Sequence, residues 1–182
     1  MKVIFLDRDG VINVDTGHLY KIGDWKFTSN CVKALKSFVK KGFEIIVITN
    51  QAGIAKGYYS VHDYNVLTDW YVNYLANKDV PILDVFYCPH HPEGNIDEFS
   101  VSCNCRKPKP GLIESAFVKY DIDIANSFLV GDKISDIRAG SEAGLENLVL
   151  LDSEYFSEEE SSALKEKHLR FKNLYDFSLN LV

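Results

Sequence analysis

Long hydrophobic runs and an excess of positive charge are both missing from this chain. Its first apolar stretch covers only residues 3–6, which is too short for the core of a signal peptide or for a membrane span. Acidic residues outnumber basic ones, 26 to 20, and the formal net charge is −6. Because a nucleic-acid-binding protein usually presents a basic face, we expect neither a membrane nor a nucleic-acid partner.

Cysteine is also scarce, with four among 182 residues. Without a visible targeting segment we expect the cytoplasm, where thiols stay reduced, so these cysteines are predicted to be buried thiols or metal ligands, not disulfides. The chain has 46% hydrophobic residues and shows neither repeats nor a low-complexity linker. We therefore predict one domain over residues 1–182, without an obligate protein partner and hence monomeric.

Apolar runs alternate with helical patterns along the chain. Strands are expected at residues 3–6, 44–49, 83–88, 127–130 and 147–151. Helices are expected at residues 30–41, 60–77, 110–117 and 136–143, followed by an acidic helix start at 157–160 and an apolar C-terminal segment that packs on the sheet. Ser60 and Asp63 are spaced like an N-terminal capping pair. This alternation predicts an α/β fold, a doubly wound parallel sheet with helices on both faces.

Two stretches, residues 15–29 and 89–110, lack such periodicity. A loop of about twenty residues in a compact domain is usually functional or held by something. The remaining intervals leave no room for a large mobile cap. We therefore expect a minimal cap and a site that stays open to small substrates.

The first predicted strand runs directly into Asp7-Arg8-Asp9-Gly10. Side chains alternate along a strand, so carboxylates two residues apart would point to one side if the strand continued through Asp9. Two anions that close repel unless a cation or a shared proton offsets them. The pattern favours a metal-dependent carboxylate pair at the mouth of a parallel sheet; an ordinary Asp/Gly turn is the alternative.

The loop over residues 88–105 gathers three of the four cysteines. Its Cys88, His90, Cys103 and Cys105 match the Cys₃His set of tetrahedral structural zinc, while His91 is a competing fourth ligand. The alternative is a polar loop with incidental cysteines. A closed four-ligand site has no open position for chemistry, so we expect zinc to fold the loop that presents Arg106 and Lys107. Cys31 falls within a predicted helix and is expected in the core.

Polar residues also follow the other predicted strands. Thr49-Asn50-Gln51 ends the second strand, where a hydroxyl and backbone amides could donate to phosphate oxygens. Asp132 follows the fourth strand and would supply a third oxygen ligand near Asp7 and Asp9, a set that suits Mg²⁺. Asp136 either caps the next helix or supports the metal from behind its ligands.

Together, Asp7-x-Asp9, Thr49, Lys107 and Gly131-Asp132 resemble the four signature elements of the haloacid dehalogenase (HAD) superfamily, and the second Asp is typical of its phosphatase branch. Three longer stretches, at residues 7–13, 49–57 and 88–108, resemble the D-glycero-D-manno-heptose 1,7-bisphosphate 7-phosphatase family. That resemblance implies a HAD-like Rossmannoid fold. It also implies hydrolysis of the C7 phosphate in bacterial heptose-nucleotide biosynthesis for lipopolysaccharide or glycan.

The resemblance also implies a role for each matched residue. Asp7 would be the nucleophile, Asp9 the general acid and base, and Thr49 and Lys107 would hold the phosphoryl oxygens. Mg²⁺ would be held by Asp7, Asp132 and the Asp9 backbone carbonyl. The substrate-binding set would comprise Asp15, Thr16, Gly17, His18, Thr49, Asn50, Gln51, Ala52, Arg106, Lys107 and Lys133.

Three other functions compete with this interpretation. The same chemistry could act on histidinol phosphate, although the Gly53–Gly57 turn and Arg106 favour the heptose enzyme. A zinc-stabilised binding protein could retain the fold without catalysis, but every proposed catalytic position holds a competent residue. A phosphomutase would share the two aspartates but commonly carries a larger cap.

Overall fold

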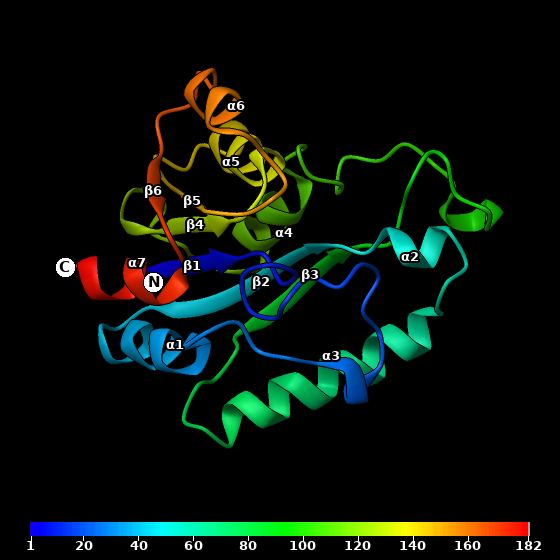
Figure 1. Cartoon of the computed structure of the whole chain (residues 1–182), viewed down its shortest axis with the longest axis horizontal. Coiled ribbons are helices and arrows are strands. Elements are labelled where there is room, and N and C mark those ends of the chain that lie inside the picture. The colour runs from blue at the N-terminus through cyan, green and yellow to red at the C-terminus, as the bar shows by residue number, and fades with distance from the viewer. Residues whose placement is uncertain (182) are drawn as a thin grey trace.

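The computed structural model describes residues 1–181 and contains one parallel sheet of six strands in the order β3-β2-β1-β4-β5-β6. The strands are β1 Val3–Leu6, β2 Glu44–Asn50, β3 Asp84–Cys88, β4 Phe128–Gly131, β5 Asn147–Leu151 and β6 Leu169–Phe171. The helices are α1 Cys31–Lys40, α2 Ala52–Ala55, α3 Val61–Ala76, α4 Gly111–Lys119, α5 Ile134–Glu142, α6 Glu158–Ser162 and α7 Leu174–Asn180. Helices cover both faces of the sheet (Figure 1), so the predicted doubly wound α/β architecture is confirmed.

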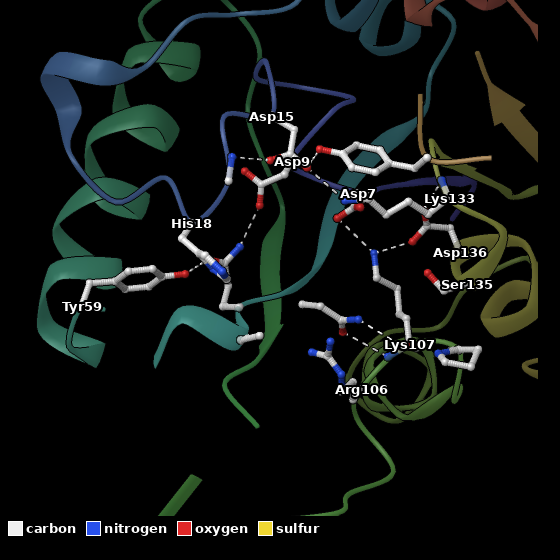
Figure 2. Close-up of a pocket in the computed structure, with 16 residues that line it drawn as sticks. Asp7, Asp9, Asp15, His18, Tyr59, Arg106, Lys107, Lys133, Ser135 and Asp136 are labelled. Carbon is white, nitrogen blue, oxygen red and sulfur yellow. Dashed lines mark hydrogen bonds and ion pairs between the residues drawn. The ribbon is translucent and has the colours of Figure 1, made fainter. Parts of the chain in front are cut away.

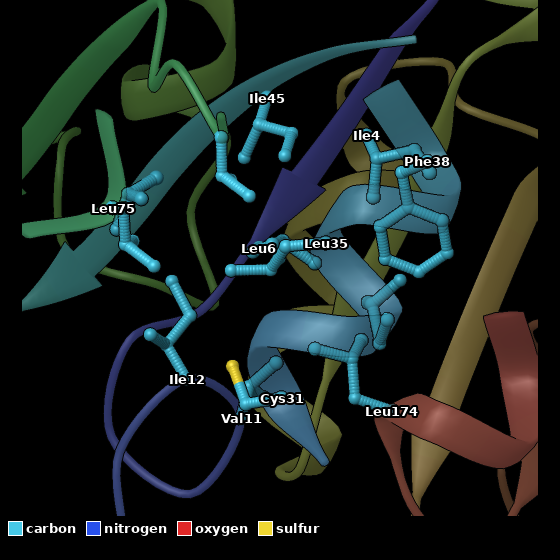
Figure 3. Packing of buried hydrophobic residues seen from close by; sticks show 14 of the residues in the cluster. Ile4, Leu6, Val11, Ile12, Cys31, Leu35, Phe38, Ile45, Leu75 and Leu174 are labelled. Atoms are coloured by element: carbon cyan, nitrogen blue, oxygen red, sulfur yellow. The ribbon is translucent and has the colours of Figure 1, made fainter. Parts of the chain in front are cut away.

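The central strand shows why both faces are covered. Every residue of β1 is fully buried: Ile4 and Leu6 belong to the apolar cluster that includes α1, α3 and α7, whereas Val3 and Phe5 belong to the cluster that includes α4 and α5. Figure 3 shows the first cluster, with Leu35 and Phe38 of α1 packed toward Ile4 and Leu6. Side chains alternate along a strand, so an uninterrupted apolar run requires an apolar layer on each side.

Helix ends follow the predicted capping chemistry. The Ser60 hydroxyl accepts a hydrogen bond from the Asp63 backbone N–H, and the Asp63 carboxylate accepts one from the Ser60 N–H, which completes a capping box before α3. Ser157 forms the same box before α6. The predicted packing of the C-terminal apolar segment is confirmed for Leu174 and Phe177 of α7, which are buried, but was wrong for Leu179, which is largely exposed.

Three local expectations were wrong or incomplete. Helix α5 begins at Ile134, two residues before the predicted start, because Asp136 caps from within the first turn by accepting the Lys133 backbone N–H. Strand β6 was not predicted, because its three residues are too few and too exposed to show a pattern. Helix α2 was missed for a similar reason, since four residues carry no helical period.

The long loop between β3 and α4 contains a single short 3₁₀ turn, Asp97–Phe99, as its lack of periodicity suggested. Among residues 1–181, no helix combines the length and the apolar character needed to cross a membrane. The register pairs Leu6 of β1 with Val47 of β2 and Val130 of β4. Residues that follow these three strands therefore meet at one edge of the sheet.

Candidate active site

A pocket of about 540 Å³ opens at this edge of the sheet (Figure 2). It is lined by Asp7, Asp9, Asp15, Gly17, His18, Asn50, Gln51, Ala52, Tyr59, Arg106, Lys107, Pro108, Lys133, Ser135, Asp136 and Tyr155. Such a crevice beyond the carboxyl ends of parallel strands is the usual ligand site in doubly wound sheets.

Most of the residues predicted for catalysis, substrate binding and magnesium meet in this pocket, but three of them do not line it. Thr16 faces a neighbouring hollow, Thr49 is fully buried behind Gln51, and Asp132 lines another hollow beside Gly10. Conversely, Tyr59, Ser135 and Tyr155 line the pocket without having been predicted, because no motif marks them. Pro108 also lines it; it ends the third matched stretch but was given no role.

Lys107 joins two of the carboxylates. Its ammonium lies 3.0 Å from Asp7 Oδ1 and 2.6 Å from Asp136 Oδ1, and it donates to the Ile48 carbonyl at 2.9 Å; Figure 2 shows it between the two aspartates. Burial alone would lower the pKa of Lys107, but the adjacent carboxylates outweigh that effect and raise it. Lys107 therefore remains a cation beside the Asp7 carboxylate.

Asp7 is buried to 6% exposure and is oriented by its neighbours. Its Oδ1 accepts the Arg8 backbone N–H at 2.7 Å. Burial raises the pKa of this carboxyl to about 6, although Lys107 opposes the shift. The group remains available as a nucleophilic carboxylate near neutral pH.

Asp9 is held by side chains from three directions. Its Oδ1 accepts from Arg8 Nη2 at 2.9 Å and from Asn13 Nδ2 at 2.9 Å, while its Oδ2 accepts from Gln51 Nε2 at 3.1 Å. The Arg8 side chain is fully buried, and the Asp9 side chain is 17% exposed toward the pocket. This arrangement fixes one rotamer of a carboxyl that remains accessible to substrate, as a general acid and base requires.

Three buried carboxylates, of Asp7, Asp132 and Asp136, each place an oxygen within 4.8 Å of the others. Neither Asp132 oxygen has a hydrogen-bond partner among residues 1–181, and burial together with Asp7 and Asp136 raises the pKa of Asp132 to about 8. Buried carboxylate oxygens without donors are costly. A divalent cation with oxygen preference fits this cluster, because it would satisfy those oxygens and offset the repulsion.

Of the two roles considered for Asp136, the helix cap is confirmed, and support of a metal stays a prediction. Its Oδ2 accepts the Lys133 N–H at 3.0 Å as a helix cap, and its Oδ1 pairs with Lys107. Gly131 permits this, since a Cβ there would lie 2.2 Å from Asp136 Cβ.

Asn50 clamps the segment that carries Lys107. Its side-chain carbonyl accepts the Lys107 N–H and its amide donates to the Lys107 carbonyl, both at 3.0 Å. The Asn50 side chain therefore positions Lys107, whereas the sequence suggested only a phosphate contact through its backbone amide.

The predicted zinc ligands converge in the loop before Lys107. Sulfur separations among Cys88, Cys103 and Cys105 are 3.0 to 3.5 Å, and His90 Nδ1 lies 3.3 Å from the Cys105 sulfur. His91 is directed elsewhere, since its Nδ1 accepts the Glu93 N–H. Three sulfurs and one imidazole nitrogen around one point suit a tetrahedral metal of zinc type.

Three further contacts shape the pocket rim. Arg106 Nη1 donates to the His90 carbonyl at 3.3 Å, which ties this pocket-lining guanidinium to the cysteine loop. On another side, Asp15 Oδ2 accepts from Lys133 Nζ at 3.1 Å and from the Tyr155 hydroxyl at 2.7 Å. The segment after β5 thereby contributes a wall that lies 140 residues from Asp15 along the chain.

Comparison with known proteins gives consistent matches. A family model described as HAD-hydrolase-like matches residues 104–177. A D-glycero-alpha-D-manno-heptose-1,7-bisphosphate 7-phosphatase of Photorhabdus laumondii is 57% identical over 83% of this chain and 82% of its own length. A D-glycero-beta-D-manno-heptose-1,7-bisphosphate 7-phosphatase of Escherichia coli K12 is 43% identical over 81% and 78% of the two chains.

A solved structure agrees with these relatives. The D,D-heptose 1,7-bisphosphate phosphatase of B. bronchiseptica, complexed with magnesium and phosphate, superposes with a TM-score of 0.85 and is 28% identical, covering 99% of this chain and 97% of its own. The likeness therefore extends over the whole sheet.

Proposed function

The chain belongs to the D-glycero-D-manno-heptose-1,7-bisphosphate 7-phosphatase family of HAD-like hydrolases, and from this premise we propose that it hydrolyses the C7 phosphate of such a heptose bisphosphate. The observation that carries the proposal is the convergence of Asp7, Asp9 and Lys107 in one pocket, where Asp7 also belongs to a buried carboxylate cluster. Of the two anomers, we propose the alpha form, because identity to the alpha-named relative is higher than to the beta-named one.

In the first step, an Asp7 oxygen attacks phosphorus, a P–O bond forms, and the bond to the sugar C7 oxygen breaks with its electron pair. Asp9 gives its proton to the departing oxygen. Lys107, which touches Asp7, neutralises charge on the phosphoryl oxygens. The products are an aspartyl-phosphate and a heptose 1-phosphate.

In the second step, Asp9 takes a proton from water, and the water oxygen attacks phosphorus of the aspartyl-phosphate. The bond to Asp7 breaks, inorganic phosphate leaves, and both aspartates return to their initial states. Thr49 and the backbone amide of Asn50 are proposed to hold the transferring oxygens with Lys107. Thr49 does not line the pocket, so its hydroxyl would do so from behind Gln51, where it is buried.

Asp7, Asp132 and the Asp9 backbone carbonyl are proposed to hold Mg²⁺. The unpartnered Asp132 oxygens support this assignment, as does the magnesium in the B. bronchiseptica relative. When bound, the ion supplies charge that offsets repulsion between the anionic nucleophile and the anionic substrate.

Cys88, His90, Cys103 and Cys105 are proposed to hold structural Zn²⁺. Four protein ligands complete a tetrahedral shell. The function of this site would be to fix the loop from which Arg106 and Lys107 enter the pocket.

Arg106 is proposed to bind the distal C1 phosphate, because a guanidinium suits bidentate phosphate recognition. The remaining pocket residues proposed to contact the sugar are Asp15, Gly17, His18, Gln51, Ala52 and Lys133, with Thr16 on the adjoining loop. We further propose a monomer, which light scattering on a sizing column tests directly.

The experiment that tests this function measures phosphate release with Mg²⁺ from both anomers of heptose 1,7-bisphosphate and from histidinol phosphate. We expect preference for the alpha anomer and no turnover by Asp7→Asn. A preference for histidinol phosphate would retain the mechanism and reject the substrate. Absence of Asp7-dependent release from all three would reject the function.

A further inference from the structure

Tyr59 is linked to Asp9, the proposed acid and base, through the side chain of Gln51. Its hydroxyl donates to Gln51 Oε1 at 2.6 Å. The amide nitrogen of the same Gln51 donates to Asp9 Oδ2 at 3.1 Å and to Thr49 Oγ1 at 2.8 Å. The Gln51 side chain is thus fully engaged on both ends, and the residue is only 2% exposed.

These contacts leave the amide one orientation. Both Asp9 oxygens accept from Arg8, and Oδ2 also accepts from Gln51 Nε2. The nitrogen of Gln51 therefore faces Asp9, and its oxygen faces the Tyr59 hydroxyl. Burial raises the pKa of the Tyr59 phenol above its ordinary value, so the hydroxyl keeps its proton and remains a donor. If Tyr59 withdrew, the buried Gln51 oxygen would have no donor and the amide could turn.

The Tyr59 ring is itself seated by two independent contacts. A Cβ at Gly53 would lie 2.2 Å from Tyr59 Cε1, so the ring approaches the backbone of α2 as only glycine allows. On its other side, Tyr20 stacks on the ring with centroids 5.1 Å apart and planes 17° apart. Packing of the ring therefore fixes the position of the Tyr59 hydroxyl independently of its hydrogen bond to Gln51.

The hydrogen bond from Gln51 also determines the direction in which the Thr49 hydroxyl hydrogen points. Because Thr49 Oγ1 accepts from Gln51, its own hydrogen is directed away from the amide and is free to donate. A single amide thus orients both the carboxyl that serves the leaving oxygen and the hydroxyl proposed for the phosphoryl group.

We propose that Tyr59 is a positioning residue that acts through Gln51 to hold the acid and base Asp9 and the phosphoryl-binding Thr49 in their working orientations. The inference rests on the proposed phosphatase function and deepens it. It gives the close packing of the Tyr59 ring against Gly53 a role in the reaction. It also assigns a task to a tyrosine that no sequence motif marked.

The test is Tyr59→Phe, which retains the ring and its packing, with Tyr20→Phe as the matched control on the stacked neighbour. On heptose bisphosphate we expect kcat to fall about tenfold, a part of the effect that general acid catalysis contributes, while KM changes by less than about twofold. Tyr20→Phe should retain kcat. Thermal unfolding of each variant shows that the fold is kept.

Two readouts separate positioning from a merely structural role. An aryl phosphate such as p-nitrophenyl phosphate needs little protonation of its leaving group, so Tyr59→Phe should cost less than about threefold on it. In a Gln51→Ala background, Tyr59→Phe should have no further effect, because the intermediary is gone. Equal losses on both esters would overturn the role of Tyr59 in orienting Asp9. Losses that multiply in the double variant would overturn the proposal as a whole, because they would show that Tyr59 does not act through Gln51.

The outcome remains readable if the substrate assignment fails. Should heptose bisphosphate not be turned over, the same comparison is made with a hexose 6-phosphate for which hydrolysis depends on Asp7. A retained kcat of Tyr59→Phe on that alkyl ester would reject the role of Tyr59 by itself.

Discussion

At the scale of single residues, the carboxylate cluster depends on a glycine as much as on its aspartates. Gly10 has φ +86°, and a Cβ at this position would lie 2.1 Å from Asp132 Oδ2. Gly144 has nearly the same φ, +90°, but nothing lies within 4 Å of its added Cβ. Substituting each of these two glycines by alanine therefore separates the free-energy cost of the left-handed backbone from the effect of crowding Asp132.

We predict that Gly144→Ala lowers the free energy of unfolding by about 1 kcal/mol through backbone strain alone and leaves kcat unchanged. Gly10→Ala should add the displacement of Asp132, so that turnover falls at least tenfold and more Mg²⁺ is needed for half-maximal rate. Denaturant unfolding and a Mg²⁺ titration of phosphate release measure both. Full activity of Gly10→Ala would show that the Asp132 carboxylate has no role at the site.

At the scale of elements, the cysteine loop and the segment after β5 hold opposite sides of the pocket. The loop fixes Arg106 through the His90 carbonyl and passes directly into Lys107, which Asn50 clamps. Loss of the proposed zinc should therefore displace Arg106 and Lys107, although neither residue is a zinc ligand.

Cys105→Ser is predicted to reduce bound zinc from one per chain to less than about half, because one of four ligands is weakened. Turnover should fall with it, since Arg106 and Lys107 lose their support. Elemental analysis and kcat are measured on the same preparation. Cys31→Ala is the control, because Cys31 is buried in α1 away from the cluster; if it lost as much zinc, the four-ligand assignment would be wrong.

The contacts of Asp15 with Tyr155 and Lys133 should contribute less to the free energy of unfolding at low pH. Burial alone would raise the pKa of Asp15, but donation by the Gly17 N–H and the Tyr155 hydroxyl, together with Lys133, lowers it overall. A depressed pKa gives stability that is present above the unfolded value of about 3.9 and is lost as pH falls through the folded value.

Asp15→Asn should consequently be less stable than the unmodified protein at pH 7, by no more than about 1 kcal/mol for a half-buried pair. The difference should shrink as pH falls below about 4. Urea unfolding over a pH series provides the measurement, and Tyr155→Phe should reproduce part of the difference from the other side of the contact. A difference that grows toward low pH would contradict the assignment.

At the scale of the whole molecule, the sequence predicts what a local pattern encodes. Five strands were predictable because apolar runs such as Val3–Leu6 are buried on both faces. Most of the site residues were predictable because they directly follow these strands in the sequence. Tyr59 and Tyr155 were not predictable, because packing across distant segments brings them to the pocket. Thr49 was expected to line the pocket but lies behind Gln51, since only the fold decides which polar residue covers another.

The last helix illustrates such long-range packing and is distant from the chemistry. The Phe177 ring of α7 lies 5.5 Å from Phe38 of α1, 5.6 Å from Phe128 of β4 and 5.4 Å from Phe171 of β6, measured between centroids. It thus joins the end of the chain to an early helix and two strands. Leu179, in the same helix, is 64% exposed.

Phe177→Ala should lower the free energy of unfolding by about 3–5 kcal/mol, because a buried ring is removed from contact with three others. Leu179→Ala should change it by less than about 0.5 kcal/mol, because that side chain is largely in water. At a temperature where both variants are folded, kcat should match the unmodified protein, since the pocket is built from other elements. Loss of kcat in folded Phe177→Ala would instead mean that the packing of α7 extends its influence to the strand ends that hold the aspartates.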